Sequence, residues 1–136
     1  MPPILRLILA IIAGIFIGSS VNMGLIMLSG SVIPPPEGID VSTAEGLKQA
    51  LPLFEPKHFI FPFLAHALGT LCGALVAALL CPKAAGKGAF IVGLFFFLGG
   101  IANVFLFSAP TWFIATDLIL AYFPMAYLGY KWAPKK

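Results

Sequence analysis

Apolar residues dominate four stretches of the chain, and prolines, glycines or charged residues bound each stretch. A helix needs about 20 apolar residues to cross the hydrocarbon core of a bilayer. Each stretch is close to that length, so the pattern predicts an all-α integral membrane protein with a bundle of four transmembrane helices. The helices are expected at 4–28, 58–80, 89–107 and 112–130.

Turn-forming residues separate the four stretches. The first break, 34–57, begins with three consecutive prolines and is the one sizeable polar segment. The second break, 82–88, is rich in lysine and glycine, and the third, 108–110, is so short that the last two helices should form a tight antiparallel hairpin. Pro62 and Pro124 each remove one backbone hydrogen bond from the helices that contain them.

A short amphipathic helix is expected inside the first break, at 41–51. Asp40 or Ser42 could cap this helix, and Ser42 followed by Glu45 has the spacing of a capping box. The apolar side chains of the segment share one face. We therefore expect the helix to lie flat on the outer membrane surface.

Composition supports the membrane assignment for the whole chain, 1–136, as a single membrane domain. Hydrophobic residues make up 60% of the sequence and charged residues 10%, whereas a soluble domain carries about 25% charged residues. The basic residues lie at the ends of apolar stretches and do not form a basic patch interleaved with aromatics, which nucleic-acid binding requires. The expected surroundings are lipid, and no nucleic-acid partner is expected.

The distribution of charge predicts the orientation of the helices, because basic residues collect on the cytoplasmic side of membrane proteins. The first break holds two of the eight basic residues together with four of the five acidic ones. Both termini are therefore expected in the cytoplasm, with the protein in the cell (inner) membrane. The remaining six basic residues are Arg6, Lys83, Lys87, Lys131, Lys135 and Lys136.

Each predicted helix carries one strongly polar residue at a similar depth. At a rise of about 1.5 Å per residue, these residues fall in the outer third of the bilayer. Small residues share their helix faces, so the polar side chains should point into the bundle, and His66 is expected to meet Asp117. The candidate binding residues of this polar layer are Asn22, His66, Asn103 and Asp117, with Thr70 and Thr116 nearby.

Two interpretations of this layer remain open. An ionisable residue at membrane depth suggests a functional site, because leaving it in lipid costs several kcal/mol. Alternatively, the side chains could hydrogen-bond one another and simply fix the packing of the helices, since such bonds average under about 1 kcal/mol in membranes.

A weak metal-site candidate lies at the start of the second helix. Glu55 and His58 have the E-x-x-H spacing that each of two helices contributes to a di-iron bundle, but the sequence holds one copy. Pro56 favours the first turn of a helix, so a capping role competes with metal binding. No cofactor is expected, because the chain carries no nucleotide-binding, haem-attachment or catalytic motif.

Three functions are compatible with the pattern. The polar layer could bind or conduct a small ion, proton or solute, in a single chain or a homo-oligomer. The protein could instead be a non-catalytic accessory or structural subunit of a larger membrane complex. It could also be a small membrane enzyme acting on a lipid or quinone, with His66 as general base oriented by Asp117 and with Tyr122 or Glu55 nearby. The sequence shows no activated nucleophile, and this disfavours an enzyme.

Overall fold

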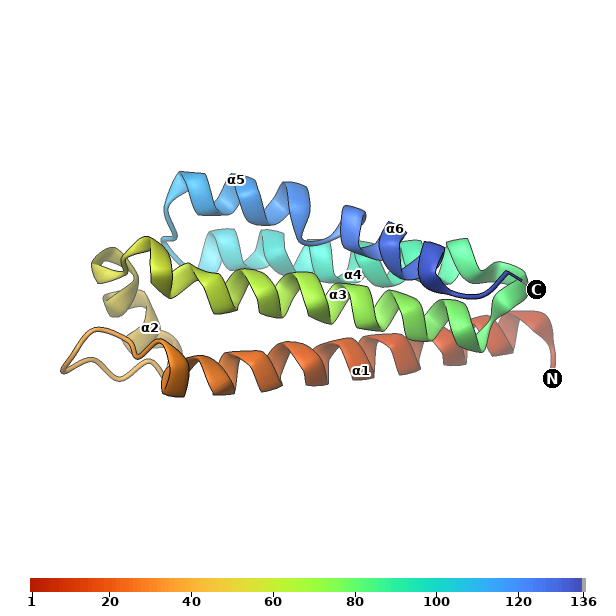
Figure 1. Ribbon diagram of the computed structural model, residues 1–136, viewed down its shortest axis with the longest axis horizontal. Coiled ribbons are helices and arrows are strands. Elements are labelled where there is room, and N and C mark those ends of the chain that lie inside the picture. The colour runs from red at the N-terminus through yellow and green to blue at the C-terminus, as the bar shows by residue number, and fades with distance from the viewer. Residues whose placement is uncertain (136) are drawn as a thin grey trace.

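The computed structural model describes residues 1–135, so Lys136, one of the six basic residues above, lies outside the described residues. Throughout this range the chain is all-helical, without strands. Four helical stretches are long and apolar enough to cross a membrane. They lie along one long axis, with both termini and the connection between the second and third stretches at the same end (Figure 1).

The observed helices depart from the predicted spans mainly at their ends. The first helix continues to Val32, and the third begins at Ala85, inside a segment expected to be a loop. Short 3-10 turns at Leu51–Leu53, Pro56–Phe59 and Pro82–Ala84 join the helices. In chain order the helices are α1 (Pro3–Val32), α2 (Ala44–Ala50), α3 (Ile60–Leu80), α4 (Ala85–Leu106), α5 (Thr111–Leu120) and α6 (Phe123–Trp132).

Glycines hold α1 directly against α3. A Cβ atom on Gly73 would lie 2.6 Å from the carbonyl oxygen of Gly14, and one on Gly18 would lie 2.5 Å from that of Gly69. Because the backbones touch at these points, any side chain would separate the two helices. The core next to this contact is built from small residues, which include Ala74, Ala77, Ala89, Val92 and Ala126.

The fourth span is two helices rather than the single helix expected at 112–130. α5 ends at Leu120 and α6 begins at Phe123, with Ala121 and Tyr122 between them. Pro124 explains the interruption, because it has no amide hydrogen to donate to the carbonyl of Leu120 and its ring clashes with that carbonyl in a regular helix.

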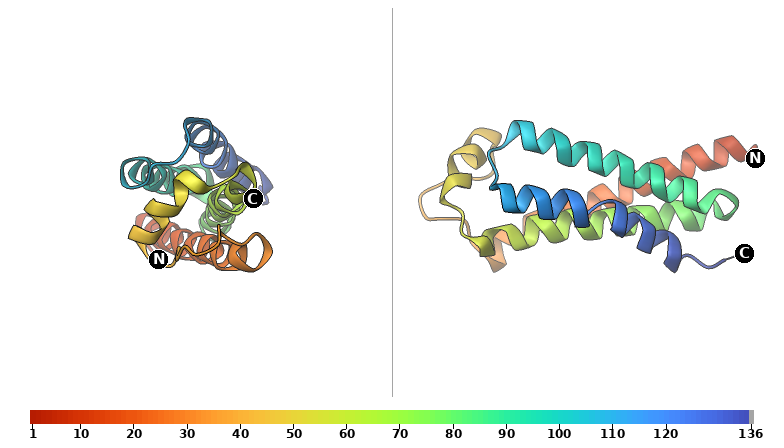
Figure 2. Two further views of the ribbon diagram at one scale, coloured as in Figure 1. Left: turned by 90° about the vertical axis from the view of Figure 1, so that its left-hand side faces the viewer. Right: turned by 90° about the horizontal axis from the view of Figure 1, so that it is seen from above.

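The segment between α1 and α3 crosses one end of the bundle (Figure 2). The N-cap of α2 is Thr43, whose hydroxyl accepts a 3.0 Å hydrogen bond from the Gly46 amide, so the capping box expected at Ser42 is wrong. Leu47 of α2 and the adjoining Leu51 pack against Phe59 and other aromatic residues of the bundle. That α2 lies flat on the outer membrane surface stays a prediction.

Candidate ligand-binding cavity

His66 on α3 and Asp117 on α5 are in direct contact. Nδ1 of His66 lies 2.7 Å from Oδ1 of Asp117, which confirms the contact expected from their depths. Asp117 is buried, with 4% of its surface exposed, whereas 17% of the His66 side chain is exposed. The carboxylate is therefore internal to the bundle and the imidazole lies at the edge of an opening.

Tyr122 completes this group from the interruption between α5 and α6. Its hydroxyl donates a 2.9 Å hydrogen bond to Oδ2 of Asp117, and its ring stacks on His66 with the centroids 5.9 Å apart. Tyr122 was expected near His66 as part of the enzyme alternative, but it was not among the expected binding residues. The signal that could have identified it is the nearby Pro124, which predicts irregular backbone at this position.

The contact between His66 and Asp117 links the hydrogen positions of the two side chains. An ionised carboxylate only accepts hydrogen bonds, so Nδ1 of His66 is the donor when Asp117 is ionised. In a neutral imidazole the other nitrogen, Nε2, is then an acceptor. Nε2 has no hydrogen-bond partner within residues 1–135, and it is not among their fully buried unpaired atoms. It is therefore an accessible acceptor held in a fixed orientation.

A cavity of about 200 Å³ lies beside His66. α1, α3 and α4 line it together with Tyr122, and its polar residues are Asn22, His66, Asn103 and Tyr122. Phe96, Ala65 and three glycines, Gly69, Gly99 and Gly100, line the rest. Three of the four polar residues predicted for the layer thus line one cavity. The fourth, Asp117, does not line it but holds the His66 ring through the hydrogen bond on the side away from the cavity.

The two asparagines of the cavity differ in environment. Oδ1 of Asn22 is buried and is the one such side-chain atom without a hydrogen-bond partner in the described part of the chain. Asn103 is exposed, although it was expected to point into the bundle. Asn22 therefore supplies an unpaired acceptor buried in the wall of the cavity, and Asn103 is the exposed asparagine of its lining.

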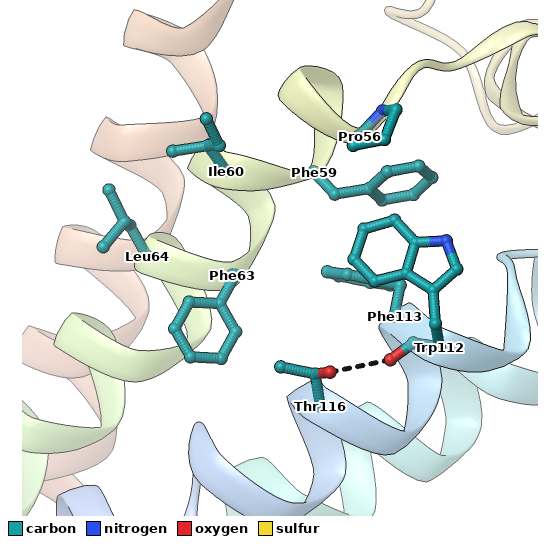
Figure 3. A pocket seen from close by; sticks show the side chains of 8 residues that line it. All are labelled: Pro56, Phe59, Ile60, Phe63, Leu64, Trp112, Phe113 and Thr116. Carbon is teal, nitrogen blue, oxygen red and sulfur yellow. Dashed lines mark hydrogen bonds between the residues drawn. The ribbon is translucent and has the colours of Figure 1, made fainter.

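The two threonines of the predicted layer lie outside the cavity. Thr70 is fully buried, and its hydroxyl donates a 2.7 Å hydrogen bond to the His66 carbonyl one turn away. The Thr116 hydroxyl donates at the same distance to the Trp112 carbonyl and faces a second pocket (Figure 3). Both hydroxyl hydrogens are donated to carbonyls of their own helices, so neither threonine can donate a hydrogen bond to a ligand.

The second pocket, of about 220 Å³, lies between the start of α3 and α5. The side chains of Phe59, Phe63, Trp112 and Phe113 surround it in Figure 3. Its lining is almost entirely apolar, so it lacks the groups that would orient a polar ligand.

Glu55 and His58, the weak metal candidates, form a helix cap. The Glu55 amide donates a 2.8 Å hydrogen bond to Nδ1 of His58, and the two residues form a reciprocal capping box. Nε2 of His58 is 3.1 Å from the Pro34 carbonyl oxygen. Both ring nitrogens have backbone partners, and across residues 1–135 no three His, Cys, Asp or Glu side chains form a group that could hold a metal ion.

Comparisons with protein-family models, with curated proteins and with solved structures found no match to this chain. The fold and the cavity define its class, which is a small all-helical protein with four helical stretches of membrane-spanning length and apolarity.

Proposed function

We propose that this is a multi-pass membrane protein that binds a small solute or a proton in the cavity beside His66. The observation that carries the proposal is the His66 imidazole, which Asp117 and Tyr122 hold from behind while its Nε2 stays unpaired. A layer that served packing alone would pair its polar atoms with one another. Here Oδ1 of Asn22 also remains without a partner.

Binding fits the geometry better than conduction. On the cytoplasmic side of the cavity, α1 and α3 meet at the carbonyls of Gly14 and Gly73, and the residues next to this contact are buried alanines and Val92. A continuous path for ions would need polar groups or water there, because the hydrocarbon region offers no other hydrogen-bond partners. The site is therefore proposed as a recess that is closed on its inner side.

The proposed orientation places both termini in the cytoplasm. Arg6 lies near the start of α1, Lys83 between α3 and α4, and Lys131 near the end of α6. These parts of the chain lie at the end of the bundle that holds the two termini (Figure 1), and basic residues prefer the cytoplasmic face. The cavity would then open in the outer half of the bilayer. Glu37→Cys and Lys87→Cys test this orientation in a chain without native cysteines. A membrane-impermeant maleimide added to intact cells should label position 37 and not 87, and the reverse pattern would contradict the orientation.

Filling the cavity tests the binding proposal. A Cβ on Gly99 meets no atom within 4 Å, so Gly99→Leu can enter the cavity without a clash. Gly24→Leu is the matched control, because Gly24 is equally unobstructed but does not line the cavity. Native mass spectrometry after mild extraction should detect a small molecule on the wild type and on Gly24→Leu but not on Gly99→Leu. Retention of the same molecule by all three proteins would place its site elsewhere.

A further inference from the structure

The hydrogen-bonding atoms of the cavity select a type of ligand. Oδ1 of Asn22 is an unpaired buried acceptor, and Nε2 of a neutral His66 is a second acceptor. A ligand that donates a hydrogen bond gains by pairing with these acceptors, whereas a ketone or an ether leaves them unpaired, as they are in the unliganded protein. The site therefore favours a ligand with O–H or N–H groups.

The same atoms favour a neutral ligand. The nearest carboxylate, Asp117, lies behind His66 and already accepts hydrogen bonds on both oxygens. A cation would therefore have no free carboxylate to pair with, and an anion would face the unpaired oxygen of Asn22. Hydroxyl groups meet the requirement, because they donate a hydrogen bond without carrying charge.

The opening of the cavity lies between α1 and α4. On the inner side the two helices are in contact, because the Phe96 ring lies against Gly18, where a Cβ would be 2.9 Å from the ring. On the outer side, Gly99 and Asn103 of α4 are exposed. At a rise of 1.5 Å per residue, Asn103 and Gly99 lie about 5–10 Å along the helix axis from the outer end of α4. The opening is therefore in the side wall of the bundle and close to its outer end, at the depth where lipid chains meet headgroups.

We infer that the ligand is a membrane-dissolved alcohol or phenol whose hydroxyl group enters sideways between α1 and α4 to reach Asn22 and His66. This inference rests on the proposed function. The volume fits, because an apolar cavity of about 150 Å³ accommodates a benzene ring and the cavity here measures about 200 Å³. The ring or short head of such a molecule occupies the cavity, and its apolar tail remains in lipid beside the exposed side chains of α1 and α4.

The experiment compares two probes that differ by one hydrogen-bond donor. The protein in lipid nanodiscs is treated with diethyl pyrocarbonate, which acylates accessible imidazole nitrogens, and mass spectrometry follows His66 with His58 as internal reference. 4-Octylphenol and 4-octylanisole have the same ring and tail, but the anisole has no O–H. We expect 4-octylphenol to slow His66 modification about tenfold at concentrations where the anisole has little effect, since a hydrogen bond of about 1.4 kcal/mol corresponds to that factor.

A third probe, water-soluble 4-hydroxybenzenesulfonate, distinguishes entry from lipid and entry from water. Equal protection by this probe and 4-octylphenol would overturn lateral entry, and equal protection by the anisole would overturn the donor requirement. Absence of protection by any probe would overturn the inference as a whole. The Gly99→Leu variant, treated without any probe, shows whether a negative result concerns the type of ligand or the proposed function itself. If His66 reacts no faster in the wild type than in Gly99→Leu without probe, the cavity is inaccessible and the proposed function itself fails.

Discussion

Replacing Asn22 with leucine should stabilise the unliganded protein, although most core substitutions destabilise. Oδ1 of Asn22 is buried without a hydrogen-bond partner, and an unsatisfied buried acceptor costs about 1–3 kcal/mol. Leucine is similar in size and has no polar atom. Its branched end has room, because Asn22 borders a cavity of about 200 Å³. The expected change in the free energy of unfolding is therefore a gain of about 1–3 kcal/mol.

Reversible unfolding in mixed micelles, with increasing sodium dodecyl sulfate, measures this change. Asn103→Leu is the control with the same chemical change at an exposed position, and it should shift the free energy of unfolding by less than about 0.5 kcal/mol. A loss of stability of more than about 0.5 kcal/mol in Asn22→Leu would refute the reasoning, because it would show that the carboxamide makes a favourable contact in the unliganded protein.

The sign of the effect should reverse when ligand is present. A ligand that binds the folded state stabilises it in proportion to its affinity, and Asn22→Leu removes one of the two acceptors that bind it. Saturating 4-octylphenol should therefore stabilise the wild type and have a much smaller effect on the variant. Equal stabilisation of the two proteins would show that Asn22 does not contact the bound hydroxyl.

Three further predictions concern packing, the carboxylate and the outer loop. Gly14→Ala should lower the free energy of unfolding by about 1–3 kcal/mol, because the added methyl overpacks the α1–α3 contact, whereas Gly24→Ala, in open space, should be nearly neutral in the same micelle titration. Tyr122→Phe should cost roughly 1.5–3 kcal/mol in that assay, since it removes the hydrogen bond to the buried Asp117, and an unchanged midpoint would contradict this role. Hydrogen bonds from the side chain and amide of Ser42 hold the pKa of Asp40 below its ordinary value. The stability that they give to this turn is therefore present above the unfolded pKa and is lost as the pH falls through the folded pKa. The protection of the amides in this turn, taken relative to their intrinsic exchange rate at each pH, should fall on acidification in the wild type and show no such pH-dependent step in Asp40→Asn.

The sequence was sufficient for the features that depend on counting residues along a helix. A fixed rise per residue placed His66 and Asp117 at a similar depth in the bilayer, so contact between them was expected, and the structure confirms that contact. Small residues at a spacing of four marked faces expected to point into the bundle, and on two of these faces the backbones of α1 and α3 touch.

Rotation about the helix axis limited the prediction for Thr116 and Asn103. Adjacent residues on a helix point about 100° apart, so Thr116 could not point to the same side of α5 as its neighbour Asp117, and the sequence already contained this restriction. The exposure of Asn103 had no such signal. It depends on how α1 packs against α4, where the Phe96 ring lies against Gly18.

The position of Tyr122 shows how two backbone features build the site together. In a continuous helix, residues five apart point about 140° away from each other, so Tyr122 would not reach Asp117. The interruption before Pro124 removes that restriction. Gly100 provides the space for the ring, since a Cβ there would lie 2.5 Å from the Tyr122 hydroxyl oxygen. The proline turns the tyrosine toward the carboxylate and the glycine admits it, so the orientation of His66 toward the cavity depends on residues that a ligand would not touch.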